Sequence, residues 1–243
     1  MIYSRNRHFC SDFFFTNHSN WVKLKKKGGD AMTTPVERYY QKRGEVLVKN
    51  LKARHFDAYY CNTKEEALSK ALELIPEGSS VGWGGALSAE QIGLMDALNA
   101  GNYRTIDRAR CTTPEEREQA AKDCMFADFF LSGANALTMD GQMVNIDGAG
   151  TRVSAVIYGP KNVLVIAGMN KVMDDLDAAI NRARTVAAPM NKQRFDPNTP
   201  CAVTGTCADC KVEGCICNHI VVTRHCRPVG RIKFILVGEN LGF

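Results

Sequence analysis

Short apolar runs alternate along the chain with longer segments whose apolar positions recur at helical spacing. Strands are predicted at residues 56–60, 80–83, 103–106, 129–131, 163–167 and 231–237. Helices are predicted to begin near residues 34, 63, 88, 113 and 171. The helix from 88 is expected to run to about residue 98, and the helix from 171 to about residue 186. This alternation is typical of an α/β fold with a mostly parallel sheet flanked by helices.

The segment from 127 to 172 carries the densest set of small and polar residues at predicted strand ends. Its hairpin signal is Asp140-Gly141, set between two apolar runs. In open α/β sheets, ligands bind outside the carboxyl ends of the strands. We therefore predict that this segment forms the floor of a binding cleft, although such residues also shape tight turns. The predicted cleft residues here are Asn135, Asp147, Gly148 and Asn170, with Lys171 as a counter-charge.

A second candidate feature is the loop GWGGALS at residues 82–88, where a predicted strand runs into paired glycines. Gly84, Gly85 and Ser88 are predicted to bind an anion at the start of the following helix. Glu90 is the only carboxylate near this loop and joins the predicted ligand-binding residues. The alternative is a tight turn with Ser88 or a neighbour as the helix cap.

Composition and charge limit the function classes. Hydrophobic residues make up 45% of the chain and charged residues 23%, as in ordinary globular proteins. No apolar run approaches the roughly 20 residues needed to span a membrane. The net charge is +5, but residues outside 1–31 hold 25 basic against 24 acidic side chains. The sequence therefore gives no electrostatic case for nucleic-acid binding, and we expect a cytoplasmic protein.

Residues 1–31 are predicted to be a non-native or disordered leader. They lack hydrophobic periodicity, and the FFF run at residues 13–15 is too short for the core of a signal peptide. The codons for residues 26–31 can form a ribosome-binding sequence ahead of Met32. We therefore expect translation to start at Met32, with a disordered basic arm as the alternative.

Six of the ten cysteines lie between Cys201 and Cys226. Cys207 and Cys210 have the C-x2-C spacing with which two thiolates bind one metal, and Cys201 with Cys215 or Cys217 can complete a four-thiolate site. The pattern is neither the bacterial ferredoxin run nor a zinc ribbon. An iron–sulfur cluster, a zinc ion, and free thiols or a redox disulfide therefore all remain open.

Taken in order, a series of motifs resembles the lactate-utilisation (LUD domain) family from Met32 to Phe243. The motifs are VGWGG (81–85), IDR (106–108), TPEER (113–117), NALT (135–138), DGQ (140–142), VNIDG (144–148), YGPKNV (158–163), GMNK (168–171), TPC (199–201), TG (204–205), Cys207, DC (209–210), IC (216–217) and LG (241–242). Cys215 stands where relatives tend to have arginine. The resemblance therefore implies Cys201, Cys207, Cys210 and Cys217 as the metal ligands.

The resemblance implies a fold like that of the sugar-phosphate isomerase and CoA-transferase superfamily, and a role in the oxidation of lactate to pyruvate. We divide the chain into the leader (1–31), a LUD-type α/β domain (32–198), a Cys-rich segment (199–230) and a closing strand (231–243). The leading hypothesis is a component of lactate or 2-hydroxyacid oxidation that binds a small carboxylate or phosphate-bearing molecule. Its cofactor is expected to be an iron–sulfur cluster, of the 4Fe–4S type, with zinc as the alternative. Other lactate-oxidation subunits and a second copy of the chain are the expected partners.

Two alternatives belong to other classes. One is a zinc-stapled transferase or isomerase that acts on a CoA ester or a sugar phosphate. The other is a non-catalytic assembly subunit in which the metal holds the last strand in place.

Overall fold

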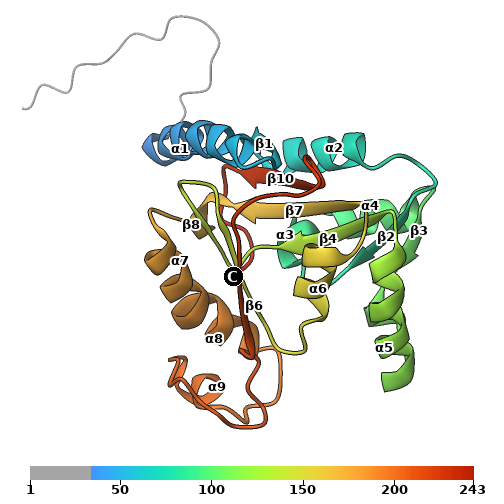
Figure 1. The fold of residues 1–243 in the computed structure, drawn as a ribbon, viewed down its shortest axis with the longest axis vertical. Helices are drawn as coiled ribbons and strands as arrows, with labels where there is room; N and C mark the ends of the chain where they lie inside the picture. The colour runs from blue at the N-terminus through green and yellow to red at the C-terminus, as the bar shows by residue number, and fades with distance from the viewer. Residues whose placement is uncertain (1–33) are drawn as a thin grey trace, which may run out of the picture. The chain divides into compact units, whose positions relative to one another are not determined.

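The computed structural model describes residues 34–243, so the predictions made for residues 1–31 and for Met32 lie outside the described residues. A six-stranded sheet forms the centre of this part (Figure 1), with strand order β1-β10-β7-β4-β2-β3. All its neighbouring strands are parallel. The strands are β1 (Asp57–Cys61), β2 (Ser80–Trp83), β3 (Arg104–Ile106), β4 (Phe129–Gly133), β7 (Asn162–Gly168) and β10 (Ile232–Val237). The predicted α/β class is confirmed.

Both faces of this sheet are buried, which explains why its central strands are almost continuously apolar. In β7, Val163 and Val165 face one core, while Leu164 and Ile166 face the other. The first core is covered by α1 (Pro35–Ala53) and α6 (Thr151–Tyr158). The second is covered by α2 (Lys64–Leu74), α3 (Leu87–Gln91) and α4 (Leu94–Ala100). The sheet is thus the middle layer of a three-layer arrangement.

A smaller sheet continues from the carboxyl end of β4. It contains β5 (Ala136–Thr138), β6 (Met143–Asp147), β8 (Val172–Met173) and β9 (His219–Thr223), in the order β8-β5-β6-β9. β5 and β6 form the antiparallel hairpin predicted around Asp140-Gly141, and Gly141 has a φ of 90°. One face of this sheet packs on α7 (Leu176–Arg182), a π-helical turn (Ala183–Ala187) and α8 (Ala188–Lys192). Most of the residues buried at this contact are alanines: Ala136, Ala179, Ala183 and Ala188.

Two helices differ from their predicted extents. The helix expected at 88–98 is broken into α3 and α4, because Gly93 adopts a φ of 78° between them. The helix expected from residue 171 begins only at Leu176, where Asp175 is the N-cap. The residues before it form a 3-10 turn (Met169–Lys171) and the short strand β8. Lys171 therefore lies in the short 3-10 turn that follows β7 rather than inside an α-helix.

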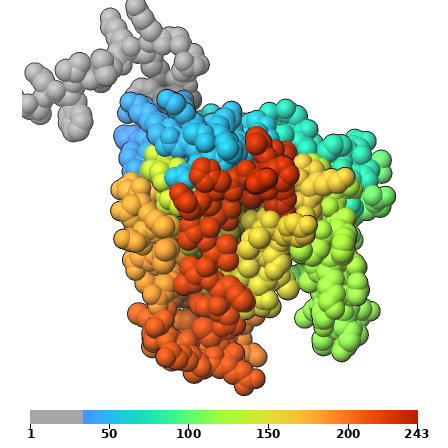
Figure 2. Space-filling view, in the orientation of Figure 1, coloured from blue at the N-terminus to red at the C-terminus, as the bar shows by residue number. Residues whose placement is uncertain are grey.

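The Cys-rich segment contains α9 (Pro200–Thr204) and then a stretch without regular structure that leads into β9. β9 was not predicted; it pairs antiparallel with β6, from Met143 opposite Thr223 to Asp147 opposite His219. Figure 2 shows α9 and the stretch that follows it, in orange, at the end of the described part that lies away from α1 and α2. After β9 the chain returns to the end of α1, where the Cys226 N–H donates to the Arg54 carbonyl. The remaining helix, α5 (Pro114–Asp123), lies in the connection between β3 and β4. Within residues 34–243, no helix has the length and apolar character needed to cross a membrane.

Candidate functional site

A cavity of about 300 Å³ lies at the carboxyl ends of β2, β4 and β7. These three strands are neighbours and parallel, so their ends deliver the loops that follow them to one edge of the sheet. The loop between β6 and α6, the end of α8, Ile216 and Phe243 complete the wall. We call this space the basic cavity. Its place in the fold agrees with the cleft predicted from the sequence.

The side chains that line the basic cavity include four basic groups and one acid. The basic residues are Arg108, Arg152, Lys171 and Arg194, and the acid is Asp147. Asp147 pairs with Arg152, and the other three basic residues have no carboxylate side chain beside them among the lining residues. A cavity with excess positive charge attracts anions, because water is partly excluded from it and therefore screens the charges less.

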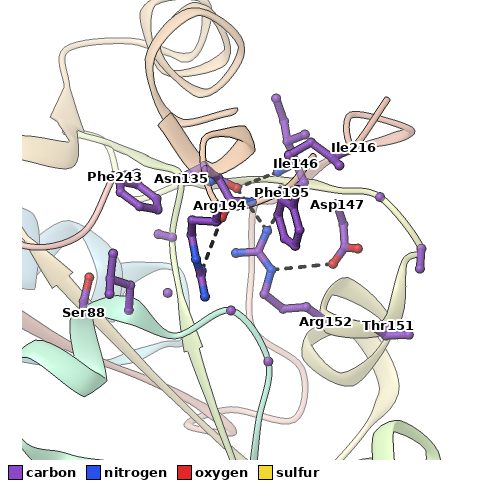
Figure 3. Close-up of a pocket in the computed structure, with 18 of the residues that line it drawn as sticks. Ser88, Asn135, Ile146, Asp147, Thr151, Arg152, Arg194, Phe195, Ile216 and Phe243 are labelled. Carbon is purple, nitrogen blue, oxygen red and sulfur yellow. Dashed lines mark hydrogen bonds and ion pairs between the residues drawn. The ribbon is translucent and has the colours of Figure 1, made fainter. Parts of the chain in front are cut away.

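Arg152 is held rigidly in the wall (Figure 3). Its Nε lies 3.6 Å from Asp147 Oδ2, and its terminal nitrogens donate to Asn145 Oδ1, Asn135 Oδ1 and the Ile146 carbonyl. Asp147 in turn accepts from the backbone N–H groups of Gly150 and Val153 at the start of α6. Arg152 and Asp147 therefore fix the conformation of the loop between β6 and α6, and Arg152 also adds positive charge to the cavity.

Lys171 is the most enclosed of the four basic groups. It is 4% exposed, and its Nζ donates to Ser88 Oγ at 3.1 Å. Burial, with the nearby charges of Arg182 and Arg152, lowers the pKa of Lys171 to about 7. Near neutral pH this amine exists in both its charged and its neutral form.

Arg108 and Arg194 are held less firmly than Arg152. Arg194 follows α8, and its guanidinium makes one long hydrogen bond, 3.5 Å to Asn191 Oδ1. Figure 3 shows that the side chains of Arg194 and Arg152 enter the same space. Arg108 lies beside Gly84, where an added Cβ would come within 3.4 Å of its guanidinium. These two arginines keep most of their donors available for a ligand.

The predicted ligand-binding residues are brought together with two exceptions. Gly84, Gly85, Ser88, Asn135, Asp147, Gly148 and Lys171 all line the basic cavity. Glu90 is exposed and does not line it. Asn170 also lies outside the lining, and its Oδ1 accepts from the Leu241 N–H at 3.0 Å. The helix after the glycine loop has only five residues and no side-chain cap, so arginine side chains supply the positive charge instead.

Sequence reasoning missed Arg152 and Arg194 and gave Arg108 no role. Arg152 carried one usable signal, since it stands in the first turn of α6, where acidic residues are normally favoured. A basic residue at that position after a glycine-rich turn indicates a role other than helix stability. Arg194 had no local signal, because α8 brings it to the cavity from a distant part of the chain.

A second cavity, of about 280 Å³, is lined by Cys201, Cys207, Cys210, Cys215 and Cys217. We call it the cysteine cavity. Its other walls come from α8 and from residues near α9. Burial and the nearby thiols of Cys215 and Cys207 raise the pKa of Cys217 to about 12. The four predicted ligands and Cys215 thus surround one space.

The chemistry of this donor set suits a thiolate-bound metal, because soft sulfur donors dominate the cavity. Among residues 34–243, however, no three His, Cys, Asp or Glu side chains are arranged to hold a single metal ion. A zinc site needs its sulfurs about 2.3 Å from one centre. The thiols therefore border a cavity rather than converge on one point.

The basic cavity and the cysteine cavity are neighbours. Ile216 lines both, and the backbone of Ile216 lies 3.5 Å from the position of a Cβ added to Gly148. A side chain at 148 would therefore begin in van der Waals contact with Ile216. Ile216, from the Cys-rich segment, thus separates the two candidate sites.

The family model described as the LUD domain matches residues 44–237. The chain belongs to the LUD domain family. The resemblance drawn from the sequence motifs is therefore confirmed. This LUD domain chain is also similar in structure to a DUF162 family protein from Deinococcus radiodurans, with 10% identity and a TM-score of 0.46. That match covers 83% of this chain and 97% of the other. A search of curated proteins gives no match.

Proposed function

We propose that this LUD domain protein is an iron–sulfur-linked component of the oxidation of lactate, or of a related 2-hydroxy acid, to the 2-oxo acid. The observation that carries the proposal is the shared wall at Ile216, which sets a cavity for anions beside a cavity lined by thiols. Substrate and electron acceptor must lie close together in such a reaction. The family membership supports the same chemistry.

In this proposal the basic cavity holds the substrate carboxylate. Arg194 and Arg108 bind it through charge-assisted hydrogen bonds, since their donors have few other partners. Arg152, fixed by Asp147 and Asn135, contributes a fixed positive charge. The cysteine cavity would hold the cluster through Cys201, Cys207, Cys210 and Cys217. A bound iron–sulfur cluster supplies a one-electron redox centre, and other lactate-oxidation subunits would carry the electrons onward.

The test begins with the absorption spectrum and metal content of the protein purified without oxygen. We expect broad absorbance near about 400 nm with stoichiometric iron. Changing Cys207 and Cys210 to serine should abolish both signals, while Cys215→Ser, the matched control, should retain them. A colourless protein with one zinc per chain would overturn the iron–sulfur role.

A zinc-stapled transferase or isomerase that binds a phosphate-bearing substrate is the second candidate. The positive charge and the glycine loop of the basic cavity favour it, because both suit phosphate as well as carboxylate. Stoichiometric zinc, together with tighter binding of phosphate esters than of 2-hydroxy acids, would select this candidate.

A further inference from the structure

Lys171 differs from the other buried lysines of the described chain in its partners. Its Nζ has one hydrogen-bond partner within residues 34–243, the hydroxyl of Ser88. By contrast, Lys192, which is 2% exposed, donates to Asn198 Oδ1 and to the Gly214 carbonyl. The half-buried Lys233 lies 3.8 Å from Asp57 and donates to Asn162. Lys171 thus lacks the carboxylate or pair of oxygens that normally holds a buried ammonium.

The position of the amine is well defined. Lys171 is the last residue of the 3-10 turn that follows β7, and both Lys171 and Ser88 line the basic cavity. A Cβ added at Gly242 would lie 2.8 Å from Lys171 Nζ and 2.8 Å from Ser88 Oγ, so the backbone of Gly242 packs closely on the pair. The amine is therefore fixed at the wall of a cavity that favours anions.

The charges around Lys171 favour a neutral, nucleophilic amine. Arg182 from α7 and Arg152 from α6 are both near enough to disfavour its protonation, and burial acts in the same direction. Ser88 from α3 is the remaining polar contact. A lysine that is removed from water beside another cation is activated toward carbonyl compounds.

We propose that Lys171 forms an imine with the keto carbon of a 2-oxo acid whose carboxylate lies in the basic cavity. This inference rests on the proposed function, because it requires the cavity to accept the product class of 2-hydroxyacid oxidation. The arginines bind the carboxylate and Lys171 meets the adjacent carbonyl. A 2-hydroxy acid lacks that carbonyl and cannot react in this way.

The step conserves atoms and electrons. The lone pair of Nζ attacks the keto carbon, a C–N bond forms, and the carbonyl electron pair moves to oxygen. The nitrogen then gives up its protons, the oxygen leaves as water, and a C=N bond remains. Nothing is oxidised or reduced. Ser88 Oγ, at 3.1 Å from Nζ, is placed to pass a proton between nitrogen and oxygen.

The experiment traps the imine on the full chain, purified without oxygen, with pyruvate and sodium borohydride. Intact mass and peptide mapping should show about one reduced adduct per chain, located on Lys171. Lys171→Arg should lower the yield at least tenfold, and Ser88→Ala should slow its formation. The matched control Lys233→Arg should react like the unchanged protein. Mapping on the unchanged chain does not depend on how any variant folds.

Calorimetric titration with oxamate, a carboxylate that resembles pyruvate but lacks a reactive ketone, separates two kinds of failure. Saturable oxamate binding without an adduct on Lys171, or with adducts spread evenly over surface lysines, would overturn the imine and leave the anion site standing. Absence of binding by both oxamate and pyruvate would overturn the proposed site and the imine together.

Discussion

At the scale of single residues, the arginines of the basic cavity have two different tasks. Arg152 is 13% exposed in its side chain and joins Asp147, Asn135 and Asn145 into one polar network. Arg194 is exposed and has a single long hydrogen bond. Arg152 therefore stabilises the fold and adds charge to the cavity, whereas Arg194 is available mainly to bind a ligand.

This difference predicts separate effects of two substitutions. Arg194→Ala should weaken oxamate binding about tenfold or more with little change in stability, because a hydrogen bond to a charged group contributes about 1.5–3 kcal/mol. Arg152→Ala should also lower the free energy of unfolding by about 3 kcal/mol, since it removes the arginine partner of a largely buried Asp147 and a donor to Asn135 and Asn145. Calorimetry and urea unfolding measure these effects, with the exposed Arg104→Ala as the control. Equal loss of stability in both variants would contradict this division.

The titration of Lys171 predicts a pH dependence of anion binding. Its pKa is lowered from 10.5 to about 7, so its charge is lost as pH rises through 7. Oxamate keeps its charge between pH 6 and 8.5, so its affinity should fall several-fold over that range in the unchanged protein. The dependence should be much flatter in Lys171→Met. A similar dependence in both proteins would assign it to another group.

The same pKa shift predicts the direction of a stability change. Between pH 7 and 10.5 the unfolded chain binds a proton at Lys171 that the folded chain does not. The contribution of Lys171 to stability therefore rises with pH across this window. Comparison with Lys171→Met in urea unfolding isolates this contribution from that of other groups.

At the scale of elements, the basic cavity depends on three parallel strands, and the cysteine cavity depends on a segment with little regular structure. The six-stranded sheet is buried on both faces. Residues 205–218, by contrast, contain no helix or strand. They are anchored at one end by α9 and at the other by the pairing of β9 with β6.

Loss of the proposed cluster should therefore loosen the Cys-rich segment and leave the large sheet intact. In the protein with both Cys207 and Cys210 changed to serine, proteases should cut within residues 199–218 several times faster than in the unchanged protein. The far-ultraviolet circular dichroism should remain close to that of the unchanged protein. Cys111→Ser, outside the cysteine cavity, is the control. Unchanged cleavage, or collapse of the whole fold, would contradict this prediction.

At the scale of the described molecule, both sheets contribute to the basic cavity, and the cysteine cavity abuts it through Ile216. The loops after β2, β4 and β7 come from the large sheet, and Asp147 ends β6 of the small one. Groups separated widely in sequence, such as Ser88 and Lys171, meet there. This convergence explains why the sequence motifs indicated many of the lining residues and an anion site, but not the arginines that supply most of its charge.

The sequence by itself determined the features that depend on local pattern. The apolar runs of β4, β7 and β10 are nearly continuous because both faces of these strands are buried, and the Asp140-Gly141 turn fixes the hairpin by its backbone preference. The family motifs and the density of cysteines were also visible in the sequence, and the motifs indicated the family correctly. Each of these signals lies within a few neighbouring residues.

Only the tertiary structure decided the features that depend on long-range contacts. β9 carries a run of β-branched residues, Ile220 to Thr223, which is a usable strand signal. Its pairing with β6 is a contact between distant parts of the chain, which the sequence does not show. Arg194 reaches the basic cavity because of the way α8 packs. Glu90 does not reach it, because its side chain on α3 is exposed to solvent. The chemistry of Lys171 arises from burial beside Arg152 and Arg182, which lie on two other helices. Burial and charge proximity are properties of the folded chain, and no local pattern encodes them.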